Sequence, residues 1–231
     1  LLCLALSVKG PSTGALVQAA FRGNLAYVGL PVALYALHGA GIEDLAGWER
    51  TTVLALAPIV PCYNILAVVV LLAGRERLSL AGVGRVVGHS LTNPLVVACV
   101  AGAICSYGRL TPPAFAFRAA TALGNMGMPL ALLSVGASLT RNGIVRSGSS
   151  ALLAALTKVV WAPLAGLLIA RILHLGPEET RIALILCACP TAVASYVMAA
   201  QYDSDGELAA GAVMISTLLA AVSLTLVVAL V

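Results

Sequence analysis

Long apolar stretches with few charged residues alternate with short polar segments along the whole chain. Each stretch is close to the roughly 20 residues that an α-helix needs to cross a lipid bilayer. The pattern predicts membrane-spanning helices joined by short loops, in a single bundle without an extramembrane domain. The predicted spans cover residues 24–40, 51–73, 86–107, 119–139, 151–170, 182–200 and 208–231.

The composition agrees with this pattern. Of the 231 residues, 61% are hydrophobic and only 10% are charged, whereas soluble domains carry about 25% charged residues. This indicates an all-α polytopic membrane protein and excludes collagenous, disordered and disulfide-scaffold classes. All six cysteines lie in apolar stretches, so we expect no disulfide. Cys187 and Cys189 lie in a span without a nearby histidine, so we expect no metal site and no cofactor.

The cations are distributed over many loops, which indicates topology determinants and no nucleic-acid partner. The loops at 9–23, 74–85, 140–150 and 201–207, which we call side A, hold seven of the 13 Lys and Arg residues. The opposite loops, side B, hold five. The positive-inside rule therefore predicts that side A is cytoplasmic.

The first residues of the chain predict a partial helix. Residues 1–8 are apolar, have no cationic segment before them and no clear cleavage site after them, so they do not resemble a signal peptide. Eight residues are also too few to cross a bilayer. We expect them to be the tail of a helix whose beginning is absent, which makes the chain N-terminally truncated.

Two predicted spans are interrupted by proline, at Pro31 and at Pro190. Each is followed by a short acidic loop and then by a long unbroken apolar helix. Since one copy ends on side A and the other on side B, the two copies have opposite orientation. Inverted repeats with interrupted helices indicate the binding site of a secondary transporter. We expect Pro31 and Pro190 to lie at mid-membrane breaks that approach one another, although isolated prolines are also common in ordinary membrane helices.

The polar residues within the spans favour an organic anion as the ligand. No Asp or Glu lies in any predicted span, which excludes an intramembrane aspartyl protease and weakens a carboxylate-based proton relay. Lys158 is the one full charge well within a span. It either snorkels to the interface or faces the interior, where it meets an anionic substrate or carbonyl groups at a helix break. Asn24 and Asn93 are either helix caps or amide donors, and the half-helix that begins near Pro190 offers partial positive charge.

Four segments carry a family resemblance. Asn24–Pro31 resembles the first crossover helix of the auxin efflux carrier family, and Ser90–Leu95 resembles the helix that opens its second repeat. Leu123–Leu139 and Cys189–Tyr202 are similar to a Pro-Leu-rich segment and to the second crossover helix of that family. The four segments occur in the family's order.

The resemblance implies ten helices in two inverted five-helix repeats, arranged as in the sodium/bile-acid symporters, with two broken helices that cross at their prolines. On this basis residues 1–8 are the truncated helix, 9–73 the remainder of the first repeat, 74–85 a cytoplasmic linker and 86–231 the complete second repeat. The second crossover departs from the family pattern because Thr191 and Ala192 stand there without an asparagine. The substrate-binding residues expected from the spans and the resemblance together are Asn24, Pro31, Asn93, Lys158, Pro190 and Thr191.

The expected function is alternating-access transport of small organic anions, either dicarboxylates such as malate and malonate or auxin-like carboxylates. The short 74–85 loop resembles the bacterial branch of the family, so we expect a multi-pass protein of the bacterial inner membrane. The expected partners are a carboxylate substrate and the lipid bilayer, with a homodimer as a further option. Two alternatives stay open: a degenerate, non-transporting scaffold and, with far less support, a membrane Ser–Lys hydrolase that uses Lys158. No other enzyme motif is present.

Overall fold

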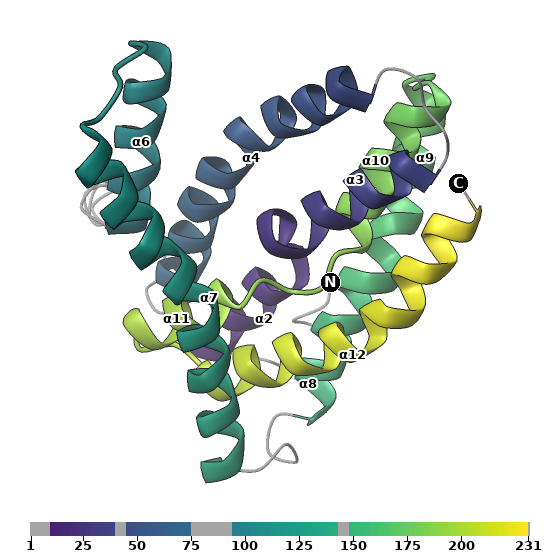
Figure 1. Cartoon of the computed structure of the whole chain (residues 1–231). Coiled ribbons are helices and arrows are strands. Elements are labelled where there is room, and N and C mark those ends of the chain that lie inside the picture. The colour runs from purple at the N-terminus through teal and green to yellow at the C-terminus, as the bar shows by residue number, and fades with distance from the viewer. Residues whose placement is uncertain (1–9, 40–44, 75–93, 143–147, 231) are drawn as a thin grey trace.

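The computed structural model describes residues 10–39, 45–74, 94–142 and 148–230, and these residues form helices and short connections without a strand (Figure 1). Within this part of the chain, three helical stretches are long and apolar enough to cross a membrane, at Ala46–Ala73, Gly148–Ile172 and Gly206–Leu230. The predicted all-α class is therefore confirmed. In chain order the elements are α2 (Pro11–Phe21), the π-helical η1 (Leu25–Gly29), α3 (Leu30–Gly39), α4 (Leu45–Ala73), α6 (Pro94–Tyr107), α7 (Ala114–Asn142), α8 (Gly148–Leu156), the π-helical η2 (Thr157–Trp161), α9 (Ala162–Ile172), α10 (Pro177–Ala188), α11 (Ala194–Gln201) and α12 (Gly206–Leu230).

Over the residues that the structure describes, the seven predicted spans coincide with helices, and one further helix in this part of the chain was missed. We expected residues 9–23 to form a loop, but most of this segment forms α2. Pro11 occupies the first turn of α2, where its missing N–H costs nothing, and no further proline follows within the segment. The segment is too short to cross a bilayer by itself, so a search for spans does not find it. Three expected features, the tail at 1–8, most of the linker at 74–85 and the start of the 86–107 span, lie outside the described residues.

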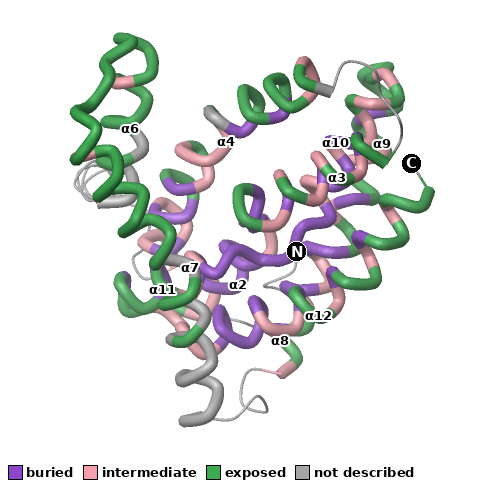
Figure 2. Tube along the Cα trace, viewed as in Figure 1, coloured by how far each residue is buried: buried purple, intermediate pink, exposed green. Residues whose placement is uncertain are grey.

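The core is built from small side chains that bring helices close together. Ala19, Ala151, Ala154 and Ala212 form one buried cluster between α2, α8 and α12. A methyl group added to Gly14 of α2 would lie 2.9 Å from a backbone atom of α4. Such contacts between small residues are typical of membrane helices, where van der Waals packing drives association. Figure 2 shows the buried residues gathered on these central helices, while α6 and α7 are largely exposed.

Two helices are broken near the middle of the bundle, and the two breaks touch. The first break is at residues 22–24, between α2 and η1, and the second is at residues 189–193, between α10 and α11. The Asn24 N–H donates to the Pro190 carbonyl (2.8 Å), and the Ala192 N–H donates to the Arg22 carbonyl (2.9 Å). Gly23 and Thr191 form an isolated antiparallel bridge. Each break thus provides hydrogen-bond partners for backbone N–H and C=O groups of the other. Such partners are required in an apolar environment. We call these two segments the crossover.

The expected break at Pro190 is confirmed, but the expected break at Pro31 is wrong. Pro31 is the second residue of α3, and the helical conformation runs without interruption from Leu25 to Gly39. The π-helical turn η1 lies immediately before it, and η2 precedes Pro163 in the same way. A wider turn gives room where a proline ring would clash with the carbonyl of residue i−4. At both prolines the helix therefore continues, and the true break precedes Pro31 at Gly23.

Candidate functional site

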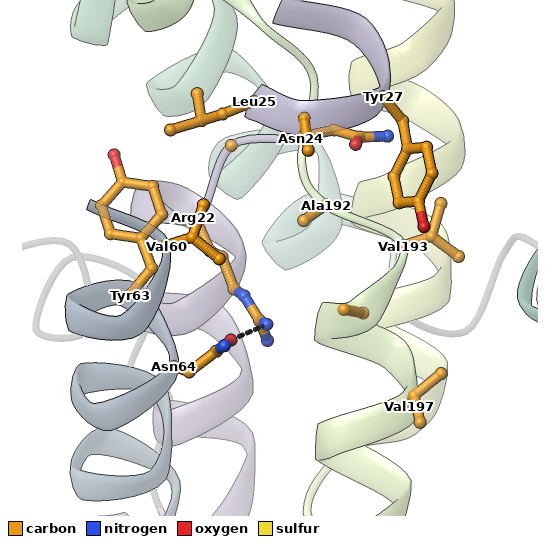
Figure 3. A pocket seen from close by; sticks show the side chains of 13 residues that line it. Arg22, Asn24, Leu25, Tyr27, Val60, Tyr63, Asn64, Ala192, Val193 and Val197 are labelled. Carbon is orange, nitrogen blue, oxygen red and sulfur yellow. Dashed lines mark hydrogen bonds between the residues drawn. The ribbon is translucent and has the colours of Figure 1, made fainter. Parts of the chain in front are cut away.

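A cavity of about 310 Å³ lies at the crossover, where both broken helices meet α4 (Figure 3). Its walls are mostly apolar, with contributions from Val60, Val193 and Val197. The polar groups are few and come from different elements. Arg22 and Asn24 belong to the first break, Asn64 to α4, and two tyrosines, Tyr27 and Tyr63, complete the polar lining.

Arg22 is the main candidate site residue that the sequence prediction missed. We expected it to be a loop cation on side A, but it directly follows α2 and is only 5% exposed. Its N–H donates to the Gln18 carbonyl (3.0 Å), which continues the turn of α2 into the break. Its guanidinium donates to the Asn64 side-chain oxygen and contacts the Met198 sulfur. Asn64, a buried amide in the middle of a long apolar span, is the signal that could have revealed this site.

Asn24 lines the cavity, as expected for a substrate-binding residue. It precedes η1, and its carbonyl accepts the N–H groups of Val28 and Gly29, each at 3.1 Å. Its side chain makes no capping hydrogen bond. Of the two roles considered for Asn24, helix cap or side-chain donor within the membrane, the geometry favours the donor.

Lys158 faces the interior of the bundle. It is 2% exposed, and its Nζ donates to the Cys187 carbonyl at 2.5 Å. Cys187 lies in the last turn of α10, where carbonyl groups have no partner within the helix. A methyl group added to Gly23 would lie 2.9 Å from the Lys158 Cε, so Lys158 also abuts the first break. The snorkelling interpretation is therefore wrong, and the predicted contact with a broken-helix carbonyl is confirmed.

Like Lys158, the predicted site residues Pro31, Pro190 and Thr191 do not line the cavity. The Thr191 hydroxyl donates to the Ala19 carbonyl (2.8 Å), and the Thr191 N–H donates to the Ser216 hydroxyl (3.0 Å). Pro190 contributes its carbonyl to the crossover, and Pro31 lies further along α3. The structure thus brings Asn24, Lys158, Pro190 and Thr191 together at the crossover. Asn93 lies outside the described residues.

Each broken helix has one C-terminal end and one N-terminal end at the crossover. The two kinds of end face different groups. The C-terminal carbonyls of α2 and α10 are met by Thr191 and Lys158, which offsets the partial negative charge there. The N-terminal turns of η1 and α11 line the cavity with residues 25–27 and 194. The first N–H groups of a helix carry partial positive charge and attract anions. The cavity therefore receives two helix N-termini in addition to the Arg22 guanidinium.

Acidic residues are absent from the buried part of this region. Among the residues that the structure describes, every Asp and Glu is exposed or half-buried. The same part of the chain holds no group of three or more His, Cys, Asp or Glu side chains that could bind a metal ion. The buried charges at the crossover are thus the two cations, Arg22 and Lys158, so the electrostatic character of the site is positive.

A family model described as a membrane transport protein matches residues 69–228. The match extends from the second half of α4 nearly to the end of α12, and so includes Lys158 and the second break. No curated protein matches the chain. Since the matched segment covers more than half of the chain and corresponds to the domain of the family suggested by the four sequence segments, the chain belongs to the auxin efflux carrier family.

Proposed function

We propose that this protein is a secondary transporter of small organic anions and that the cavity at the crossover is its substrate site. The observation that carries the proposal is the convergence of two helix N-termini and the buried Arg22 on one cavity. A carboxylate placed there would accept charge-assisted hydrogen bonds from the guanidinium, which are stronger than neutral ones. Asn24 and Asn64 would supply further amide groups at the same wall.

The arrangement of the helices supports two inverted repeats as the basis of alternating access. The order half-helix, break, half-helix and long helix occurs in α2–α3–α4 and again in α10–α11–α12. Ser12 at the start of α2 donates to Asp205 before α12 (2.7 Å), so these starts share side A. Trp48 of α4 and Glu179 of α10 line one cavity, so the starts of these helices lie close together at the opposite end. The two half-helices α2 and α10 therefore approach the crossover from opposite ends, as inverted repeats require.

The candidate substrates are malate, malonate and auxin-like carboxylates, and the proposed location is the bacterial inner membrane with side A in the cytoplasm. The homodimer remains a further proposal. Arg22, which was counted on side A, proved to lie inside the bundle. The cation count therefore falls from seven against five to six against five, so topology requires its own test by cysteine labelling from each side.

The test is uptake of radiolabelled malate, malonate and an aromatic monocarboxylate by proteoliposomes that contain the full chain. We expect saturable uptake of at least one anion. In Arg22→Gln we expect the apparent affinity to fall by about 10- to 100-fold, since a hydrogen bond to a charged group is worth about 1.5–3 kcal/mol. Arg171→Gln is the matched control, because Arg171 is an exposed arginine on α9. Absence of uptake for every anion by the folded protein would favour the non-transporting scaffold.

A further inference from the structure

The carbonyl groups at the end of α10 lie where transporters with broken helices can bind a coupling cation. In such proteins the C-terminal ends of half-helices and the unwound backbone after them coordinate Na⁺. Here the chain supplies its own donors to these groups. The Cys187 carbonyl accepts from the Lys158 Nζ at 2.5 Å, and the Pro190 carbonyl accepts the N–H of Asn24 at 2.8 Å. The broken end of α10 is therefore coordinated from within the protein.

Lys158 reaches this position from a third helix. It belongs to the π-helical turn η2, which contacts α2, α10 and α12, and its side chain is 2% exposed. A methyl group added to Gly23 would lie 2.9 Å from the Lys158 Cε and 3.2 Å from its Nζ. The ammonium thus lies between the end of α10 and the first break, against both halves of the crossover.

The lysine ammonium has the properties that would stabilise an alkali metal ion at the same place. Both are compact monovalent cations, and both are stabilised by the partial negative charge at a helix C-terminus. The lysine is covalently part of the protein, so its charge is present whether or not Na⁺ is in solution. Arg22 adds a second buried cation at the first break, and like charges repel strongly in an apolar environment. A metal ion that entered the crossover would therefore be repelled by two fixed cations.

We propose that the Lys158 ammonium is a built-in cation of the crossover, in the place that a coupling metal ion takes in other transporters, so that binding and transport of the anion require no Na⁺. The inference rests on the proposed function, because only a transporter has a coupling ion, and it extends that function from the substrate to its coupling. Arg22 and Lys158 then have separate roles. Arg22 meets the substrate in the cavity, and Lys158 holds the two breaks together beside it.

The test measures thermal unfolding of the full chain in detergent, without any substrate. For the parent we expect the same Tm in NaCl and in N-methylglucamine chloride of equal ionic strength. Lys158→Ala should have a lower Tm, and propylammonium carries the atoms that this substitution removes. We expect propylammonium to raise the Tm of Lys158→Ala by about 2–4 °C more than that of the parent. The neutral propanol should have no such selective effect, because it does not restore the charge.

The matched control is Val160→Ala, which shortens another side chain of η2, one that is 40% exposed. Propylammonium should affect this variant and the parent equally. The inference is overturned if Na⁺ raises the Tm of the parent above its value in N-methylglucamine, or if propylammonium stabilises Lys158→Ala no more than Val160→Ala. The comparison of the two salts needs no variant, so it decides the question even if Lys158→Ala does not fold.

Uptake into proteoliposomes separates this inference from the proposed function. Replacement of Na⁺ by N-methylglucamine on both sides of the membrane should leave the rate of carboxylate uptake by the parent unchanged. Uptake that requires Na⁺ would overturn the built-in cation and leave the proposed function intact. A protein that transports no carboxylate, yet shows selective stabilisation of Lys158→Ala by propylammonium, still has the built-in cation at the crossover.

Discussion

Arg22 and Lys158 are both buried cations at the crossover, yet they meet different groups. Lys158 donates to the Cys187 carbonyl at the end of α10 and does not line the cavity. Arg22 lines the cavity and bonds Asn64. The sequence pattern led to Lys158 as the cation for the substrate, whereas the geometry gives Arg22 the direct position. Lys158 instead stabilises the broken end of α10 and thereby the shape of the site.

Lys158→Ala and Lys158→Arg should both reduce anion uptake at least about tenfold, the effect of a lost hydrogen bond to a charged group. Alanine removes the donor to the Cys187 carbonyl. Arginine is larger and planar, and Lys158 Cε already approaches Gly23 so closely that an added methyl would lie 2.9 Å away. Uptake into proteoliposomes measures both effects, with thermal unfolding in detergent as the check for folding.

Gly23→Ala should reproduce this loss while Lys158 is intact, because the new methyl group would displace the lysine side chain. The control is Gly102→Ala, since nothing lies within 4 Å of a methyl group at Gly102 in α6. Normal transport by Lys158→Ala would show that the site does not depend on this cation.

At the scale of elements, the crossover explains which features the sequence could predict. The end of α10 was predictable, because a proline removes an N–H and restricts the residue before it. The break at residues 22–24 was not predictable, because glycine alone is common in membrane helices. This break depends on contacts with segments that are distant in the sequence. Gly23 has to accommodate Lys158, and Arg22 and Asn24 pair with a segment about 170 residues away. The π-helical turn η1, which allows the helix to continue through Pro31, likewise has no clear signature in a single sequence.

Pro31 and Pro190 looked equivalent in the sequence, but their replacement by alanine should affect anion uptake differently. Pro190→Ala restores an N–H and allows α10 to extend through residues 189–193, which would separate the two breaks. We expect loss of anion uptake with normal membrane insertion. Pro31→Ala lies within a continuous helix and should retain most of the uptake, since it only removes the reason for the π-turn. Equal losses in both variants, measured by uptake at matched protein amounts, would contradict the location of the first break.

At the scale of the whole molecule, composition and span pattern were sufficient for the all-α membrane class, and the four sequence segments were sufficient for the family. The proposed substrate site was not derivable at the same level, because it combines the end of α2, which is too short for a span, with single polar residues of α4. Large apolar residues such as Phe115, Leu123 and Leu133 are exposed on α7, as expected for a surface that faces lipid or further helices. The positive charge of the interior, set by Arg22 and Lys158, is the basis on which we propose an anion site in this bundle.

Direct binding of a labelled carboxylate to the purified protein tests whether the crossover contains an anion-binding site. Equilibrium dialysis in detergent with labelled malonate, malate and an aromatic monocarboxylate gives a Kd without dependence on transport direction or coupling ion. We expect saturable binding of at least one of them, a Kd that rises by about 10- to 100-fold in Arg22→Gln, and no change in the exposed control Arg118→Gln. Equal Kd values for the folded parent and Arg22→Gln, or no binding of any carboxylate, would contradict an anion site at the crossover.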